Sequence, residues 1–214
     1  MPSASPYRVK LTNMELSSLS REGYRYNSSK VVWVITSVYL GLTLTSTLAL
    51  WAAGMSLFDA VNHAFSIAAT GGFSPRNLSI GYYQSDLINI LVIFFMAVSA
   101  LHFGLIYAVA VTRSLKPLNN TVVKYYFGSI LVLSLMIMFA LKLDGGYESW
   151  GKAAMDSTFT VVSYMTTTGF AICDNSQWPW LAGIVLIFVS FQCGCSGSTT
   201  GGLKVDRILI SFKA

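Results

Sequence analysis

Charged side chains are scarce in this sequence. Asp, Glu, Lys and Arg together make up 11% of its 214 residues, whereas a soluble globular domain carries roughly 25%. Hydrophobic residues make up 54%. So few charged groups could not cover the surface of a soluble fold. The composition therefore excludes a soluble enzyme domain and indicates an integral membrane protein.

Cysteines are few, and an apolar leader is missing. The three cysteines are too few and too clustered for a disulfide framework: Cys173, Cys193 and Cys195. Residues 1–30 are polar and contain no apolar stretch of the kind that a cleavable signal peptide needs. We therefore interpret residues 1–30 as a cytoplasmic tail or linker.

What the sequence does contain is long runs without any residue that is ionised at neutral pH. A transmembrane helix needs about 20 apolar residues, with a range of about 17–25. Four runs are long enough, the third only just: residues 31–58, 87–112, 125–141 and 175–203. The sequence therefore predicts an all-α protein that crosses the membrane several times.

The basic residues are unevenly divided among the segments that connect these runs. If the N-terminus lies in the cytoplasm, the inner segments hold eleven Lys and Arg residues, and the outer segments hold only Arg76, Lys142 and Lys152. This excess follows the positive-inside rule. The net charge of +5 therefore indicates a topology with both termini in the cytoplasm, and not a nucleic-acid partner.

Residues 59–73 are repeated at residues 156–170. Sliding the sequence by 97 residues superimposes the two segments without a gap, and each lies between two uncharged runs in the same order. Five of the fifteen positions are identical: Asp59/Asp156, Ser66/Ser163, Thr70/Thr167, Gly72/Gly169 and Phe73/Phe170. The chain therefore divides into two pore repeats, residues 31–112 and 122–214, joined by a cytoplasmic loop at 113–121.

Each repeated segment is too short to cross a membrane. About ten helical residues extend about 15 Å, which is half of a hydrocarbon core of about 30 Å. The segment must therefore enter and return on the same side. At membrane depth, non-helical chain is tolerated only where it is buried in protein or lines a water-filled cavity. The sequence predicts two re-entrant helices, whose N-termini are capped by Asp59 and Asp156.

The chain that returns from each helix is a candidate for a cation filter. We call residues 70–73 and 167–170 the return segments. A helix that dips in from outside points its partially negative C-terminal end toward the membrane centre, and glycine lets the following carbonyls turn toward a pore. The alternative interpretation is that Gly72 and Gly169 are ordinary turn glycines in outer loops.

The fourth uncharged run is interrupted by glycines. From Trp180 to Cys193 there are only about 13 residues, or about 20 Å of helix, which is less than the hydrocarbon core requires. Four glycines follow within nine residues and disfavour a helix: Gly194, Gly197, Gly201 and Gly202. We expect the chain to break within the membrane and to line the pore. A flexible surface linker is the alternative.

The glycine-rich stretch does not match a phosphate-binding P-loop. Gly197 and Gly202 have the required spacing, but Leu203 precedes Lys204 and no Ser or Thr follows.

Other reactive side chains also fail to form a recognisable site. Cys193 and Cys195 have no histidine nearby in the sequence, so they make a poor metal site and are better explained as small packing residues. His63 and His102 lie in apolar segments without a partnered carboxylate, and we interpret them as neutral hydrogen-bonding groups between helices. The sequence therefore does not predict an enzyme.

The sequence resembles the Trk/Ktr/HKT superfamily of potassium uptake proteins, and most of all its bacterial TrkH branch. The resemblance extends from about residue 31 to the end. It rests on Thr-Gly-Gly-Phe-Ser at 70–74, Thr-Thr-Thr-Gly-Phe-Ala at 166–171 and Cys-Ser-Gly-Ser-Thr-Thr-Gly-Gly-Leu-Lys at 195–204. It implies an all-α integral membrane fold of four helix–pore-helix–helix repeats around one pore, with re-entrant pore loops. This chain resembles the second and third repeats, the third with its broken last transmembrane helix.

The resemblance also implies a function and its residues. Potassium uptake would use backbone carbonyls of the filter to coordinate K+, at Thr70, Gly71, Gly72, Phe73, Thr167, Thr168, Gly169 and Phe170. An intramembrane gating loop would obstruct the path below the filter, formed by Cys193, Gly194, Cys195, Ser196, Gly197, Ser198, Thr199, Thr200, Gly201, Gly202 and Lys204.

Expected ligands and partners follow from the same resemblance. K+ would be the transported ligand, and no covalently bound cofactor is expected. The partners would be membrane lipid and a cytoplasmic, nucleotide-binding regulatory subunit of the TrkA or KtrA type, with no nucleic acid. The protein would be a multi-pass protein of the cell inner membrane.

Two departures from the family pattern limit this expectation. The family loop usually carries Gly where this chain has Cys193 and Thr200. The first and fourth repeats are absent, and half a ring of carbonyls cannot replace the hydration shell of K+. We expect a fragment of a longer transporter, or two copies that pair as a homodimer. The alternative functions are a non-conducting fragment or scaffold, and a membrane-embedded redox or metal enzyme.

Overall fold

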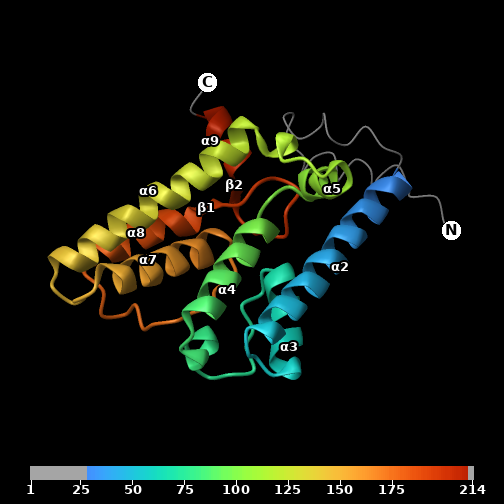
Figure 1. Ribbon diagram of the computed structural model, residues 1–214. Coiled ribbons are helices and arrows are strands. Elements are labelled where there is room, and N and C mark those ends of the chain that lie inside the picture. Colours follow the sequence, from blue (N-terminus) through green and yellow to red (C-terminus); the bar gives the residue numbers. More distant parts are fainter. Residues whose placement is uncertain (1–27, 212–214) are drawn as a thin grey trace.

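The structure is a computed structural model that describes residues 28–211 (Figure 1). The expected tail at residues 1–30 lies almost entirely outside this part. Two of the described helices, α2 (Ser28–Ala52) and α6 (Thr121–Leu143), are long and apolar enough to cross a membrane. A third crossing exists if the bent pair α4–α5 is counted as one span. These lengths and compositions support a membrane protein.

Each long helix is followed by a shorter helix that packs against it. Helix α3 (Leu57–Ala68) packs on α2, and α7 (Trp150–Met165) packs on α6 (Figure 1). The chain then leaves each short helix through one of the return segments. In the first half it continues through the 3-10 helix η2 (Ser79–Tyr83) into α4. In the second half it continues into α8.

The run at residues 87–112 predicts one straight crossing, but the chain bends there. The chain changes direction by 106° between helices α4 (Asp86–Ser99) and α5 (Phe103–Thr112). At the bend, the Cys195 N–H donates to the Ala100 carbonyl at 2.9 Å, and the Phe103 N–H donates to the Gly197 carbonyl at 3.1 Å. The glycine-rich segment thus satisfies backbone groups at the break. The hydropathy of the sequence cannot predict these contacts, because they join residues that are far apart along the chain.

The loop between α5 and α6 contains a short 3-10 helix, η3 (Lys116–Leu118). After α6 and α7, helix α8 (Trp180–Phe191) ends after 12 residues. Strand β1 (Gln192–Cys193) then pairs in parallel with β2 (Leu203–Lys204), which leads directly into α9 (Val205–Ser211). We call residues 193–204 the glycine-rich loop. Its two ends lie side by side because of the strand pair.

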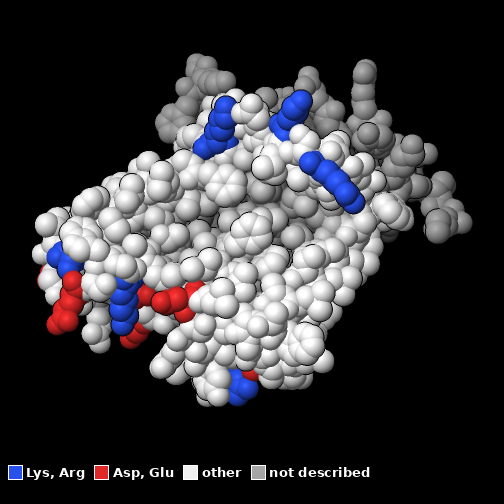
Figure 2. All heavy atoms as spheres, in the orientation of Figure 1, with Lys and Arg blue, Asp and Glu red and all other residues white. Residues whose placement is uncertain are grey.

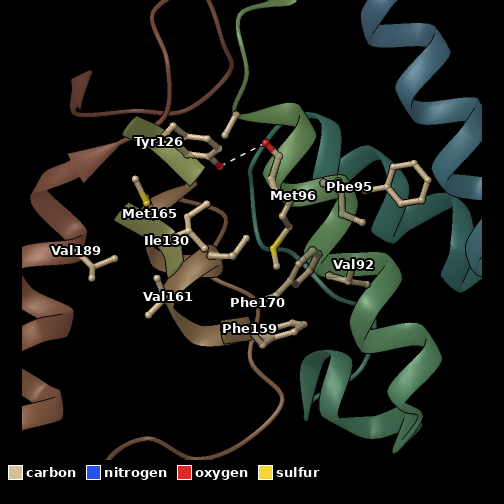
Figure 3. Close-up of a cluster of buried hydrophobic side chains, with 14 of the residues drawn as sticks. Val92, Phe95, Met96, Tyr126, Ile130, Phe159, Val161, Met165, Phe170 and Val189 are labelled. Carbon is tan, nitrogen blue, oxygen red and sulfur yellow. Dashed lines mark hydrogen bonds between the residues drawn. The ribbon is translucent and has the colours of Figure 1, made fainter. Parts of the chain in front are cut away.

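The hydrophobic core joins the two halves of the chain. Buried side chains from α4, α6, α7 and α8 meet there (Figure 3), among them Val92, Met96, Tyr126, Ile130, Phe159, Met165 and Val189. The Tyr126 hydroxyl donates to the Ala97 carbonyl at 3.3 Å, which satisfies the one polar atom of a fully buried ring. The relative position of the two halves is therefore set by packing.

The outer surface of the helices is apolar. Trp33, Leu44, Leu131 and Phe188 are each more than half exposed, which suits contact with lipid and not with water. In Figure 2, basic side chains alone appear at the end that carries α5 and α9, whereas acidic and basic side chains both appear at the opposite end. An uncharged band separates the two ends, as expected for a membrane-embedded surface.

Candidate functional site

The two return segments, 97 residues apart in the sequence, lie against each other in the structure. A Cβ atom added to Gly72 would overlap the carbonyl oxygen of Thr168 and would lie 3.3 Å from the carbonyl carbon of Gly169. The fold therefore brings together the two sets of residues that the sequence predicts as filter ligands.

Both return segments have the same backbone conformation. Thr70 and Thr167 have φ values of 51° and 55°, and Gly72 and Gly169 have φ values of 70° and 83°. A left-handed conformation is unusual for a β-branched residue such as threonine and is retained only where the surrounding structure enforces it. The same φ pattern therefore recurs at the aligned positions of the two return segments.

Hydrogen bonds to the preceding helix hold this conformation. The Gly71 N–H donates to the Ser66 carbonyl at 2.8 Å, and the equivalent Thr168 N–H donates to the Ser163 carbonyl at 3.0 Å. Within residues 28–211, the carbonyl oxygens of residues 70–73 and 167–169 accept no hydrogen bond. The Phe170 carbonyl, which the resemblance also predicts as a K+ ligand, differs because it accepts from the Ser163 hydroxyl at 2.7 Å. Backbone carbonyls without a partner are free to coordinate a cation.

The glycine-rich loop contacts both return segments at equivalent positions. The Thr70 hydroxyl shares its proton between the Ala69 carbonyl at 2.8 Å and the Thr199 carbonyl at 3.2 Å, and the Gly201 N–H donates to the Thr167 hydroxyl at 3.0 Å. We call the two bonds to the loop the threonine contacts. They place the centre of the loop, around Thr200, directly beside the two left-handed threonines.

The loop is also anchored to its surroundings and to itself. The Ser196 N–H donates to the Asp206 carboxylate at 3.2 Å, and the Lys204 ammonium group donates to the Thr200 carbonyl. A Cβ atom on Gly197 would lie 2.6 Å from the His102 ring, so only glycine fits against this residue at the α4–α5 bend. Cys193 and Cys195 are buried and are free thiols, as expected for small packing residues.

The prediction that Asp59 and Asp156 cap their helices is wrong. The cap of α3 is Ser56, whose hydroxyl accepts a hydrogen bond from the Asp59 N–H at 3.1 Å, and α7 begins at Trp150, well before Asp156. Each aspartate marks the boundary of an uncharged run in the sequence, but the helix that contains it begins before it. Both carboxylates are buried and bind side chains instead of the helix end.

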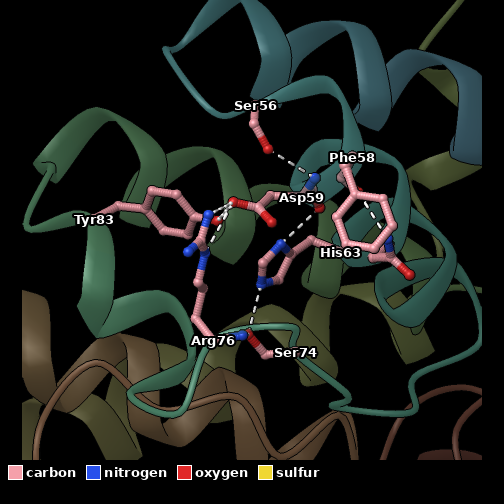
Figure 4. Close-up of polar contacts among 8 residues, drawn as sticks. Ser56, Phe58, Asp59, His63, Ser74, Arg76 and Tyr83 are labelled. Atoms are coloured by element: carbon pink, nitrogen blue, oxygen red, sulfur yellow. Dashed lines mark hydrogen bonds and ion pairs between the residues drawn. The ribbon is translucent and has the colours of Figure 1, made fainter.

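Asp59 belongs to a network of polar residues at the N-terminal end of α3 (Figure 4). Its carboxylate accepts from both Nε and an Nη of Arg76, at 3.0 and 2.7 Å, and from the Tyr83 hydroxyl at 2.8 Å. His63 and Ser74 complete this group, which consists of Asp59, His63, Ser74, Arg76 and Tyr83. Burial alone would raise the pKa of Asp59, but the bonds from Arg76 and Tyr83 hold this pKa below its usual value.

Within residues 28–211, no Arg or Lys side chain forms an ion pair with the equivalent carboxylate of the second repeat, Asp156. Asp156 accepts from the Tyr147 hydroxyl at 2.8 Å, and Cys173 occupies the position equivalent to Arg76. Burial therefore raises the pKa of Asp156. The sequence alone assigns no role at the site to Ser74, Arg76 or Tyr83. The available signal was that Arg76 is one of only three basic residues on the predicted outer side.

We expect Asp156 to bind its proton at a higher pH than Asp59. The lowered pKa of Asp59 means that its stabilising effect is present above its unfolded pKa of about 3.9 and is lost only as pH falls through the folded value. The raised pKa of Asp156 means that folded protein gains stability as pH falls through that value.

The thermal unfolding temperature of purified protein between pH 4 and pH 7 would test this difference. Asp156→Asn should remove the gain in stability at the acidic end of this range. Asp59→Asn should lower the unfolding temperature across the whole range, because its partner Arg76 loses the carboxylate. Identical pH responses of the two variants would contradict the opposite pKa shifts of Asp59 and Asp156.

Comparison with known proteins places the chain in a family. The family model described as "TrkH: Cation transport protein" matches residues 6–214. The Trk system potassium uptake protein TrkH of Salmonella typhimurium is 38% identical over 187 residues, which are 87% of this chain and 38% of that protein. TrkG of Escherichia coli is 35% identical over 189 residues, which are 87% of this chain and 38% of that protein.

A solved structure agrees with these sequence relatives. The crystal structure of the potassium transporter TrkH from Vibrio parahaemolyticus matches with a TM-score of 0.79 and 34% identity, over 92% of this chain and 41% of that one. The chain thus spans about two fifths of the length of the relatives it matches. Because these relatives are transporters, the prediction that the chain is not an enzyme is confirmed. The chain belongs to the TrkH family of cation transport proteins.

Proposed function

We propose that this chain provides two filter segments and the gating loop of a potassium uptake pore. The observation that carries the proposal is the pairing of the two return segments, whose carbonyls at 70–73 and 167–169 accept no hydrogen bond within residues 28–211. These oxygens would replace part of the hydration shell of K+. Uptake would be passive and driven by the membrane potential, which supplies about 2.3 kcal/mol per charge per 100 mV.

The glycine-rich loop would act as the gate. Its threonine contacts hold it against both filter segments, and its backbone is satisfied by hydrogen bonds to the α4–α5 bend and to Asp206. A loop held in this place would obstruct an ion that leaves the filter toward the cytoplasm. A cytoplasmic nucleotide-binding regulatory subunit would shift it, and the protein would lie in the inner membrane with both termini in the cytoplasm.

Two phenylalanines at equivalent positions differ in exposure, and this difference supports an incomplete ring of repeats. Phe170 is 3% exposed, and its ring lies 5.6 Å from that of His63 in the first repeat. Phe73, at the equivalent position, is 81% exposed. If the repeats follow one another around a pore, Phe73 would pack on the short helix of a preceding repeat. That repeat would come from the rest of the transporter or from a second copy of this chain.

A flux measurement with two proteins tests the proposed function. The first is this chain alone in liposomes, and the second is a chimaera in which residues 31–211 replace the matching segment of the Vibrio parahaemolyticus transporter. We expect Rb+ uptake that resists competition by Na+ from the chimaera and none from the chain alone. Selective uptake by the chain alone would mean that two copies complete the ring. A chimaera that does not conduct, beside a parent transporter that does, would favour the non-conducting scaffold.

A further inference from the structure

The two return segments share one backbone conformation but are held in it by different side chains. In the second repeat, the Ser163 hydroxyl on α7 donates to the Phe170 carbonyl at 2.7 Å, directly at the end of the return segment. The equivalent Ser66 on α3 is 7% exposed, and its hydroxyl has no hydrogen-bond partner within residues 28–211. The first segment must therefore be held in some other way.

His63 supplies one attachment for the first segment. Its ring is fully buried on α3, with Nδ1 at 2.7 Å from the Asp59 carbonyl and Nε2 at 2.9 Å from the Ser74 hydroxyl (Figure 4). A carbonyl only accepts, so Nδ1 carries the proton. The neutral ring then accepts the Ser74 proton at Nε2. Ser74 directly follows the return segment, so this bond attaches the end of that segment to α3.

Arg76 supplies a second attachment. Its backbone N–H donates to the Ser74 hydroxyl oxygen at 3.1 Å, and its guanidinium group binds the Asp59 carboxylate through two nitrogens. Asp59 and His63 are four residues apart and lie on the same face of α3. The chain at 74–76 is thus bound to two successive turns of α3, through Asp59 and through His63.

The second repeat has none of these three side chains. The positions equivalent to His63, Ser74 and Arg76 hold Thr160, Ala171 and Cys173.

The chain after the second segment is held from outside its own repeat. The Ala171 N–H donates to the Ser79 hydroxyl at 3.3 Å, and the Gly81 N–H donates to the Ala171 carbonyl at 3.1 Å. Ser79 and Gly81 belong to η2 of the first repeat. A shift of the first return chain would therefore also move the second.

We propose that His63, Ser74 and Arg76 are positioning residues that determine the ion specificity of the first filter segment. This inference rests on the proposed function and names residues that act behind the filter without touching the ion. Selectivity for K+ over Na+ depends on the size of the carbonyl cage or on the number and field strength of its carbonyls. Both change if the end of the segment is released from α3.

Ser74→Ala is the decisive variant, because alanine is the residue at the equivalent position of the second repeat. It removes the hydroxyl that joins His63 to the Arg76 N–H and leaves the ion pair with Asp59 in place. In the chimaera, we expect the ratio of Rb+ to Na+ flux to fall about fivefold, which corresponds to about 1 kcal/mol for one net hydrogen bond. Ser74→Thr keeps the hydroxyl and should restore the ratio.

Ser66→Ala is the matched control, since it removes an unpartnered hydroxyl from the same helix. It should leave the flux ratio unchanged. The thermal unfolding temperature of each variant separates specificity from general loss of structure. A ratio that stays normal in Ser74→Ala, or that falls equally in Ser66→Ala or Ser74→Thr, would overturn the inference and leave the proposed function intact. An unmodified chimaera without Rb+ flux would overturn both.

Discussion

We expect removal of residues 194–202 to raise Rb+ flux about 30-fold when no regulatory subunit is present. The deletion eliminates both threonine contacts, which hold the glycine-rich loop against Thr70 and Thr167. Two net hydrogen bonds of about 1 kcal/mol each correspond to about a 30-fold change in the occupancy of the closed state. The flux of the chimaera into liposomes, with and without the deletion, measures the effect.

Cys193 lies opposite Lys204 in the parallel pair β1–β2, and parallel strands cannot be joined by a two-residue turn. A flexible linker of Gly and Ser residues therefore takes the place of residues 194–202 in the deleted protein, so that β1 and β2 can stay paired. If flux in the deleted protein still requires the regulatory subunit, the loop is not the gate.

Single substitutions provide a graded version of the same test. Thr167→Val removes the acceptor for the Gly201 N–H and should raise flux about fivefold, because one net hydrogen bond is lost. Thr45→Val on α2 is the matched control. The Thr45 hydroxyl binds the Gly41 carbonyl of its own helix at 2.7 Å, so its removal should leave the gate unchanged.

Gly72→Ser should abolish discrimination between K+ and Na+, and Gly169→Ser should only reduce it. Both glycines have a positive φ, so each substitution costs about 1–2 kcal/mol of backbone strain. Their surroundings differ, however. A Cβ atom on Gly72 would overlap the Thr168 carbonyl oxygen, one of the proposed ligands, whereas a Cβ atom on Gly169 would have no atom of the described residues within 4 Å.

Competition between Rb+ and Na+ in the chimaera measures this difference. The displaced Thr168 carbonyl should lower the flux ratio of Gly72→Ser more than tenfold, since a ligand moves as well as the backbone. Gly128→Ala, in the middle of α6 with open space around its Cα, is a control that should change nothing. Equal losses in the two serine variants would mean that strain alone, and not the Thr168 carbonyl, sets selectivity.

Much of the fold was predictable from the sequence because it depends on local properties. Hydropathy over about 20 residues predicts the helices α2 and α6, since a helix in lipid must be apolar along its length. Glycines at 194–202 predict where the last helix ends, because they disfavour a helix whatever surrounds them. The repeat at a spacing of 97 residues predicts two equivalent return segments, and the structure shows that they have equivalent backbone conformations.

Other predictions failed because they required knowledge of contacts. The 106° bend between α4 and α5 occurs in a run that looks continuous, and backbone groups of Cys195 and Gly197, far along the chain, satisfy the break. Asp59 and Asp156 look like helix caps, yet Arg76, Tyr83 and Tyr147 bind them instead. A local pattern does not indicate which partner a buried carboxylate will find.

The sequence by itself determined the class of protein, its two long membrane helices α2 and α6, and its family, because composition, periodicity and motifs are properties of neighbouring residues. Only the tertiary structure decided that the two return segments meet, that the glycine-rich loop binds Thr70 and Thr167, and that His63, Ser74 and Arg76 hold one segment while Ser163 holds the other. These contacts join residues that packing brings together, and packing depends on the whole chain at once.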